Sequence, residues 1–198
     1  MFDKKYLTAK NVLQILKEAE EKGIKADFDG KTIVDVLDFR NYVFSTPVSF
    51  QKTTFRCTVY FMGATFQGDV SFSGATFEGY ADFKDATFEK YADFSGATLL
   101  GEAYFTDARF RYYVSFRDAT FLHDITFRYA TFMYYANFED ARFKNRANFE
   151  NATFEKYVDF WNAMFWCEAY FTGATFKNYV YFCRATFDRY ASFANASF

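Results

Sequence analysis

The sequence predicts an all-β solenoid in which a four-sided coil repeats about eight times, with a capping α-helix at its N-terminus. The first observation is that Phe recurs at steps that alternate between five and six residues, from Phe39 to Phe198, with Leu99 in one of these places. The second is a small residue two positions before almost every Phe. The third is the absence of a helical period along this region.

The repeat unit combines one step of each length, as in ATFEKYADFSG from Ala86 to Gly96. Its pattern is Ala-Thr-Phe-x-x-x-Ala/Val-x-Phe-x-turn, and Ala opens every unit from Ala64 to Ala196. Residues two apart in an extended chain point to the same side, so Ala and Phe face inward and the polar residue between them faces solvent. The last position is usually Gly, Asp or Asn, which favour a tight turn.

The sixth position of the unit sets the size of the coil. From residue 91 onward, this position is tyrosine in every second unit, whereas it varies in the intervening units, which indicates a coil of two units with four sides. Because stacked strands lie about 4.8 Å apart, successive rings of the tyrosine series can touch. This predicted tyrosine ladder consists of Tyr91, Tyr113, Tyr135, Tyr157 and Tyr179. The intervening residues are Tyr80, Glu102, Asp124, Arg146, Glu168 and Tyr190.

Several segments match the Ala-Asp/Asn-Leu-x-x motif of a known family, with Phe in place of the central Leu. They are Ala81-Asp82-Phe83, Ala92-Asp93-Phe94, Ala136-Asn137-Phe138 and Ala147-Asn148-Phe149. The chain beyond residue 40 therefore resembles the pentapeptide repeat family, and the resemblance implies a right-handed quadrilateral β-helix. Every second repeat here has a sixth residue, so we expect one corner in each half-coil to bulge.

Residues 1–24 are predicted to form the capping helix that covers the first coil. Thr8 is suited to the N-cap, and Gly23 is suited to a left-handed C-cap. An apolar face is expected on this helix. That face consists of Val12, Leu13, Leu16 and Ala19, with Ile15 beside them.

Residues 25–63 are predicted to be degenerate first coils, and residues 64–198 the regular β-helix. The first recognisable repeat is Ala26-Asp27-Phe28, which lies one unit before Phe39. A β-hairpin that turns at Asp29-Gly30 is the alternative. No comparable cap follows the last repeat, Ala196-Ser197-Phe198. We therefore expect either that the chain has been truncated at this point or that this end pairs with another copy. Because related proteins often dimerise through this end, the resemblance implies a homodimer through the C-terminal coil.

Composition disfavours several classes of function. With 25 acidic and 23 basic residues, the net charge of −2 indicates neither a nucleic-acid binder nor an acidic mimic of nucleic acid. The sequence shows no signal peptide and no apolar run long enough to cross a membrane, so we expect a cytoplasmic protein without a membrane partner. Cys57, Cys167 and Cys183 are neither spaced for a metal site nor placed for a disulfide.

Enzyme motifs are absent, and the expected Phe-filled interior leaves no cleft. The lone His123 has no evident partner, and we expect it on the surface. Outward carboxylates such as Asp82 and Asp93 alternate along open faces and suit solvation better than acid–base catalysis. The sequence therefore predicts a protein that is not an enzyme and has no catalytic residues, cofactor or metal.

Charged and aromatic residues are nevertheless distributed unevenly along the chain. Residues 69–107 have a net charge of −6, and residues 108–146 have a net charge of +3. The basic stretch interleaves arginine with tyrosine, two residue types that are enriched at binding hot spots. The candidate partner-binding surface consists of Arg109, Arg111, Tyr112, Tyr113, Arg117, Tyr134 and Tyr135. The alternative interpretation is a ladder that stiffens one edge, with arginines stacked over its rings. A weaker candidate surface contains Leu100, Leu122 and Trp166.

These observations favour a non-enzymatic scaffold or protein-binding rod with an unidentified protein partner. The alternative comes from the resemblance, since some pentapeptide repeat proteins mimic DNA and bind and protect DNA gyrase. Those rods are strongly acidic, whereas this chain is nearly neutral, which disfavours gyrase as the partner. Direct nucleic-acid binding through the arginine and tyrosine residues is a third, less favoured interpretation.

Overall fold

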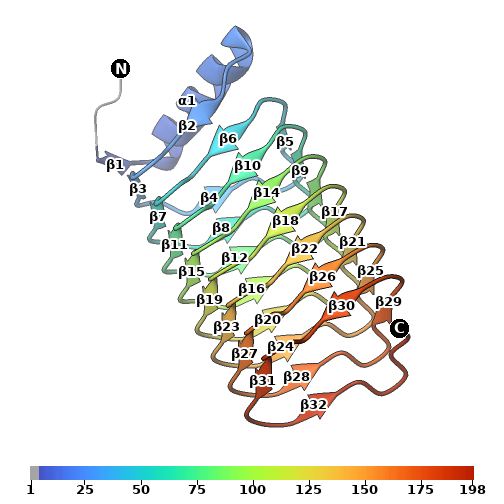
Figure 1. The fold of residues 1–198 in the computed structure, drawn as a ribbon. Helices are drawn as coiled ribbons and strands as arrows, with labels where there is room; N and C mark the ends of the chain where they lie inside the picture. Colours follow the sequence, from blue (N-terminus) through green and yellow to red (C-terminus); the bar gives the residue numbers. More distant parts are fainter. Residues whose placement is uncertain (1–4) are drawn as a thin grey trace.

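The computed structural model describes residues 5–198 as a solenoid of four parallel β-sheets with one helix at its N-terminal end (Figure 1). Every strand is two residues long, and each complete coil contributes one strand to each sheet. We name the sheets A to D, and the chain visits them in the order B, A, C, D, so that B lies opposite C and A lies opposite D. The predicted all-β solenoid of about eight four-sided coils is confirmed.

The strands of each sheet follow one another along the rod. Sheet A contains β1 (Tyr6–Leu7), β3 (Thr32–Ile33), β7 (Thr54–Phe55), β11 (Thr76–Phe77), β15 (Thr98–Leu99), β19 (Thr120–Phe121), β23 (Arg142–Phe143), β27 (Met164–Phe165) and β31 (Thr186–Phe187). Sheet B contains β2 (Ala26–Asp27), β6 (Val48–Ser49), β10 (Val70–Ser71), β14 (Ala92–Asp93), β18 (Val114–Ser115), β22 (Ala136–Asn137), β26 (Val158–Asp159) and β30 (Val180–Tyr181). Sheet C contains β4 (Leu37–Asp38), β8 (Val59–Tyr60), β12 (Ala81–Asp82), β16 (Ala103–Tyr104), β20 (Ile125–Thr126), β24 (Ala147–Asn148), β28 (Ala169–Tyr170) and β32 (Ala191–Ser192). Sheet D contains β5 (Val43–Phe44), β9 (Thr65–Phe66), β13 (Thr87–Phe88), β17 (Arg109–Phe110), β21 (Thr131–Phe132), β25 (Thr153–Phe154) and β29 (Thr175–Phe176).

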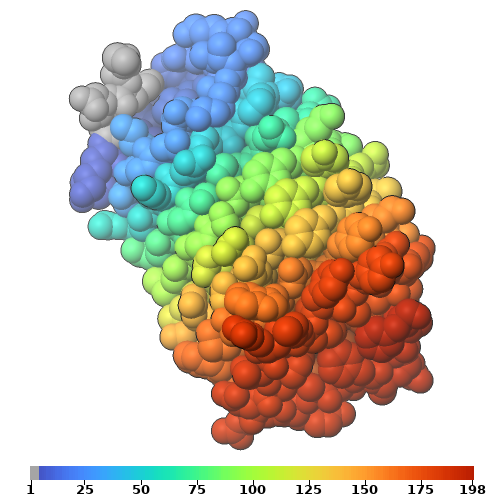
Figure 2. Space-filling model, viewed as in Figure 1, coloured from blue at the N-terminus to red at the C-terminus, as the bar shows by residue number. Residues whose placement is uncertain are grey.

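The register between coils is constant. Each strand pairs with the equivalent strand of the next coil, as Ala92 does with Val114 and Thr98 with Thr120. Equivalent side chains of successive coils therefore stack directly on one another, and we call such a stack a column. The space-filling view shows the result as successive bands of colour across the rod (Figure 2).

The interior is a set of Phe columns. On sheet C, Phe105 and Phe127 stack with ring centroids 5.0 Å apart, and Phe127 and Phe149 follow at 4.9 Å. Rings of neighbouring columns meet edge to face, as Phe105 and Phe116 do at 5.5 Å and 86°. Both arrangements suit the quadrupole of the rings, so each core Phe gains contacts along and across the rod. The small residue two positions before each Phe leaves room for these rings.

The corners of the coil are of two kinds. The corners from B to A and from C to D are tight turns in which one residue has a left-handed conformation, such as Gly96 at φ 63° and Asp107 at φ 58°. The N–H of Ala97 donates to the carbonyl of Phe94 at 3.1 Å and closes such a turn. The other two corners, A to C and D to B, contain three residues between strands. The sixth residue of every second repeat is accommodated there.

The capping helix α1 (Ala9–Lys22) has the predicted caps. The Thr8 side chain accepts from the N–H of Asn11, and Gly23 has φ 63°. Val12, Leu16 and Ala19 are buried and join the hydrophobic core. The assignment of Leu13 to this face was wrong, because Leu13 is 49% exposed. One residue along a helix rotates the side chain by about 100°, which turns Leu13 away from the coil when Val12 faces it.

Polar contacts attach α1 to the first coil, and a short strand completes the cap. The N–H of Ala9 donates to Asp35 at 2.9 Å, and the hydroxyl of Tyr42 donates to Glu20 at 3.2 Å. Strand β1 pairs in parallel with β3 and covers the N-terminal edge of sheet A. Sequence patterns gave no indication of β1, since two residues carry too little periodicity.

The first coils already follow the solenoid path. Strand β2 pairs with β6, whereas β3 pairs with β1 and β7. The alternative of a β-hairpin at Asp29-Gly30 is therefore wrong. Where later coils have Ala, this early region has buried Thr53, whose hydroxyl donates to the carbonyl of Phe28 at 2.6 Å.

The last coil leaves its interior side partly open. Phe198 stacks on Phe176 at 5.1 Å but remains 75% exposed, and the rings of Phe182, Phe187 and Phe193 are only partly buried. The homodimer that we expect through this coil stays a prediction.

Replacing a ring in the middle of a column tests the core. We expect Phe127→Ala to lower the free energy of unfolding by about 3–5 kcal/mol, because Phe127 is fully buried and stacked on both sides. Phe198→Ala is the matched control at an exposed column end, and we expect it to cost less than about 1 kcal/mol. Denaturant-induced unfolding measures both, and equal effects of the two variants would contradict the assigned burial.

Replacing a turn glycine tests the tight corners. A Cβ atom on Gly96 would meet only the Gly74 nitrogen, at 4.0 Å, so Gly96→Ala probes the left-handed backbone alone. We expect this variant to lose about 1–2 kcal/mol of stability. Gly96→Asn should lose less, because asparagine tolerates this conformation and occupies the equivalent turn position at Asn162. Equal stability of wild type and Gly96→Ala would contradict the turn geometry.

Candidate interaction surfaces

The corner between sheets D and B exposes the tyrosines of the predicted partner-binding surface. Tyr112 and Tyr134 occupy its middle column and stack with centroids 5.3 Å apart and planes at 6°. They are 52% and 50% exposed, respectively. Met133 lies beside them in the adjacent column and is also exposed. A preformed pair of parallel rings therefore lies open to solvent at this corner.

The tyrosine ladder occupies the next column of the same corner, and its stacked pairs form two runs. Tyr91, Tyr113 and Tyr135 stack at centroid distances of 5.1 and 5.2 Å, and Tyr157 and Tyr179 stack at 5.6 Å. Among residues 5–198, Tyr135 and Tyr157 do not form such a pair. The hydroxyl of Tyr135 instead donates to Asp159 at 3.4 Å. The predicted ladder is thus divided in two.

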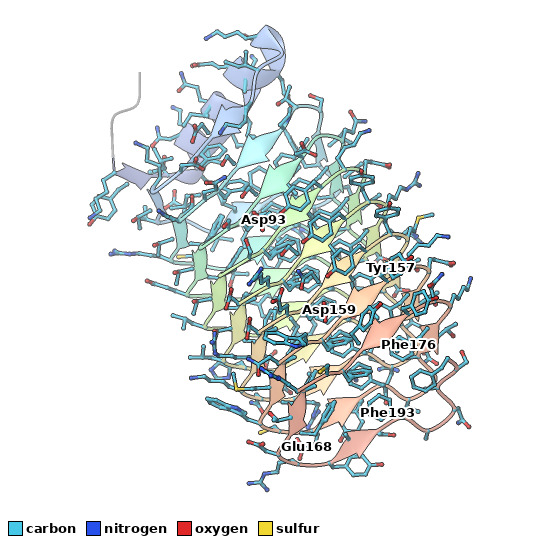
Figure 3. The ribbon with its side chains drawn as sticks, viewed as in Figure 1. Asp93, Tyr157, Asp159, Glu168, Phe176 and Phe193 are labelled. Atoms are coloured by element: carbon cyan, nitrogen blue, oxygen red, sulfur yellow. The ribbon has the colours of Figure 1, made fainter. Side chains whose placement is uncertain are left out.

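Carboxylates of sheet B lie close to the ladder hydroxyls. Asp93 and Asp159 are outward residues of β14 and β26, and Figure 3 shows them on the face that the ladder borders. Burial and the nearby Asp93 carboxylate raise the pKa of Tyr91 to about 12. Burial and Asp159 also raise the pKa of Tyr135. The first run of the ladder is therefore packed against the sheet rather than free in solvent.

Two of the three predicted arginines lie near this corner, and the third does not. Arg109 is the exposed outward residue of β17, and Arg111 occupies the corner, 3.5 Å from Glu89 of the preceding coil. Arg117 lies at the opposite edge of sheet B, in the B-to-A turn. There it forms ion pairs with Glu139 at 3.4 Å and Asp118 at 3.5 Å. The structure thus groups six of the seven predicted residues and separates Arg117 from them.

The remaining basic residues of the stretch 108–146 are distributed around the rod. Arg142 projects from sheet A, Arg128 lies in a C-to-D turn 3.1 Å from Glu150, and Arg146 lies at the A-to-C corner 3.9 Å from Asp124. Lys144 lies 4.8 Å from the ring centroid of Trp166. The basic stretch of the sequence therefore forms no single positively charged face of the kind that tracks a nucleic-acid backbone.

Arginines do not stack over the ladder, contrary to the alternative interpretation of the sequence. In residues 5–198 the cations that lie over rings contact other aromatic residues. These rings belong to Tyr6, Tyr60, Tyr129, Trp161 and Trp166. The ladder tyrosines stack on one another within each run, and the carboxylates of sheet B contact Tyr91 and Tyr135.

The aromatic residues of sheet C were not among the residues predicted for the partner-binding surface. Tyr60, Tyr104 and Tyr170 are the outward residues of their strands, and Tyr80 packs on Tyr104 at 4.9 Å. A hollow of about 370 Å³ opens beside Tyr104 and contains none of the predicted surface residues. The sequence could have indicated this hollow, because the outward residue of the sheet C strands changes from a tyrosine to smaller residues in successive coils. The predicted surfaces were instead chosen from corner residues.

The other sequence candidates lie apart from one another. His123 is exposed, and Cys57, Cys167 and Cys183 are free thiols. Between residues 5 and 198 no three His, Cys, Asp or Glu residues gather in a way that suits a metal ion. Leu100 and Leu122 are partly covered, and Trp166 is exposed beneath Lys144. None of the helical residues described here forms a segment long and apolar enough to span a bilayer.

Comparison with known families agrees with the geometry. The family model for pentapeptide repeats (9 copies) matches residues 28–76, 39–87, 83–131 and 127–165, which together cover more than half of the chain. The chain therefore belongs to the pentapeptide repeat family. No curated protein matches the sequence.

Alkaline titration tests the packing of the ladder. Because the pKa of Tyr91 in the folded chain is about 12, above the ordinary value of 10, the neutral phenol is favoured by folding. This contribution to stability is complete below pH 10 and is lost as the pH rises through about 12. In the ultraviolet absorbance of tyrosinate, we expect Tyr91→Phe to remove one tyrosine from the late step near pH 12.

The urea-unfolded chain is the control for this titration, since its 16 tyrosines should ionise together near pH 10. Loss of amplitude from the early step in Tyr91→Phe would contradict the packing of Tyr91 against sheet B.

Proposed function

We propose that the protein is a non-enzymatic rod that binds a partner protein through the corner between sheets D and B. The observation that carries this proposal is the exposed, parallel stack of Tyr112 and Tyr134. Neither ring belongs to the buried core, which the inward Phe columns and the small or aliphatic residues beside them fill. Large aromatic side chains left in solvent by a regular repeat are typical of contact residues.

The stack is also preorganised for association. Each ring is already held against its neighbour in the next coil, so binding would cost little side-chain entropy. Tyrosine combines a flat apolar surface with a hydroxyl that can donate and accept hydrogen bonds, which explains its frequency in binding surfaces. Exposed Met133 adds an adaptable apolar contact beside the rings.

Arg109 and Arg111 supply charge at the edge of the same surface. Arg109 has no ion pair with any residue of the described range, and Arg111 is 3.5 Å from Glu89 but remains solvent-accessible. Both can therefore contact carboxylates of a partner at the rim of the interface. Rim charges of this kind act mainly on specificity and association rate. Arg117, at the far edge of sheet B, is outside the proposed contact.

Site-specific photo-crosslinking tests the proposal. A benzoylphenylalanine residue placed at Tyr112 should form a covalent adduct with a defined partner protein in cells that naturally express the chain. The same residue at exposed Glu78, on the diagonally opposite A-to-C corner, is the control and should not give that adduct. We expect Tyr112→Ser/Tyr134→Ser to weaken binding of the identified partner at least about tenfold, as loss of a hot spot does.

Identical adducts from positions 112 and 78, or no protein adduct from position 112, would contradict a contact at this corner.

A supercoiling assay of DNA gyrase with micromolar protein tests the alternative function that the family resemblance implies, in which the protein binds gyrase. We expect no inhibition, because the chain is nearly neutral, with a net charge of −2. Inhibition that survives Tyr112→Ser/Tyr134→Ser would move the function away from the proposed surface.

A further inference from the structure

A hollow on sheet C forms a second potential binding site, on the side of the rod opposite sheet B. Its volume is about 370 Å³, and its lining comes from three successive coils. The cause is a change in the outward column, where Thr126 and Asn148 follow the much larger Tyr104. Two short side chains beside a tyrosine leave a depression about two strand spacings, or about 10 Å, long.

An aromatic ring and two carboxylates line one end of the hollow. Glu102, Tyr104 and Asp107 all belong to β16 and its flanking corners, and all three line the hollow. The Tyr104 hydroxyl donates to Glu102, and Tyr80, from the same corner one coil earlier, packs against the Tyr104 ring at a centroid distance of 4.9 Å. Both contacts hold Tyr104 in position. A ring face flanked by carboxylates is a favourable environment for an organic cation.

The charges of the hollow also favour a cation. Its two arginines already face carboxylates, since Arg128 lies 3.1 Å from Glu150 and Arg146 lies 3.9 Å from Asp124. Glu102 and Asp107, in contrast, form no ion pair with any residue between 5 and 198. The carboxylates of Glu102 and Asp107 can therefore form an ion pair with a cationic ligand.

We propose that this hollow receives a lysine or arginine side chain from an extended segment of a partner protein. The cationic head would lie against Tyr104 and form charge-assisted hydrogen bonds with the Glu102 or Asp107 carboxylate, which are stronger than hydrogen bonds between neutral groups. The hollow is longer than one such head group, so its remainder can take the adjoining peptide backbone. There the Thr126 oxygen accepts from the N–H of Arg128 at 3.2 Å, which leaves the Thr126 O–H free to donate to a carbonyl.

This site is separate from the surface of the proposed function. Sheets B and C lie on opposite sides of each coil, and the hollow shares no residue with the Tyr112/Tyr134 corner. A partner could therefore occupy one surface and leave the other free. Failure of either proposal does not affect the other.

Titration of the isotope-labelled protein by NMR tests the site with three blocked pentapeptides. They have the form acetyl-Gly-Gly-X-Gly-Gly-amide, with X as arginine, lysine or norleucine. We expect the arginine or the lysine peptide to cause saturable shifts confined to residues 102–107, 124–129 and 146–148. The uncharged norleucine peptide should bind at least about tenfold more weakly, because it lacks the charge-assisted contacts.

E102Q/D107N should weaken binding of the cationic peptide at least about tenfold. Asparagine occupies equivalent left-handed turns elsewhere, as at Asn151 and Asn162, so the fold should tolerate this variant. E78Q/D118N is the matched control, since it removes the same charges outside the hollow, and Asp118 has the same turn geometry as Asp107. We expect this control to bind as the wild type does.

Three outcomes would overturn the proposal. They are the absence of saturable shifts, equal binding of all three peptides, and equal weakening by E102Q/D107N and E78Q/D118N. If E102Q/D107N fails to fold, Tyr104→Thr replaces it, because threonine fills the same column position at Thr126. Unchanged binding of the cationic peptide to Tyr104→Thr would likewise overturn the proposal.

Discussion

Stacking of Phe on Phe at the constant register between coils is the interaction on which the rest of this structure depends. The core rings lie 4.5 to 5.6 Å from the equivalent ring of the next coil, so they follow the spacing of the strands that carry them. A change in register by one residue would turn the rings outward. The same constraint fixes the positions of all outward residues, because each of them is stacked on its equivalent in the neighbouring coil.

This arrangement separates stability from recognition. Inward positions are almost restricted to Phe and a small residue, whereas corner and strand-middle positions are free to vary from coil to coil. Tyr112 and Tyr134 at one corner, and Thr126 and Asn148 on sheet C, are such local variations. The first adds exposed rings to the surface, and the second removes bulk from it. Both change what the rod can contact without changing how it is held together.

Periodicity made the architecture predictable from sequence, down to individual corners. The left-handed turn residues, the size of the coil and the caps of α1 all follow from patterns that repeat or from local chemistry. The exposure of Leu13, the strand β1 and the position of Arg117 did not follow. They depend on how the helix is rotated on the first coil and on which side of the coil a residue lies. In the sequence, residues 108–146 form one basic zone. In the structure, the coil path distributes the basic residues of this zone over all four sides of the rod. Many of them form ion pairs with carboxylates of adjacent coils.

The division between a core that stabilises and a surface that recognises is the central claim of this account. The most direct measurement compares the unfolding free energy of Tyr112→Ser/Tyr134→Ser with that of Phe105→Ala/Phe127→Ala in denaturant. We expect the tyrosine pair to cost less than about 1.5 kcal/mol, since an exposed stack contributes no more than that. The Phe pair should cost several times as much. A tyrosine pair as costly as the Phe pair would show that the corner serves stability, and would contradict its assignment as a recognition surface.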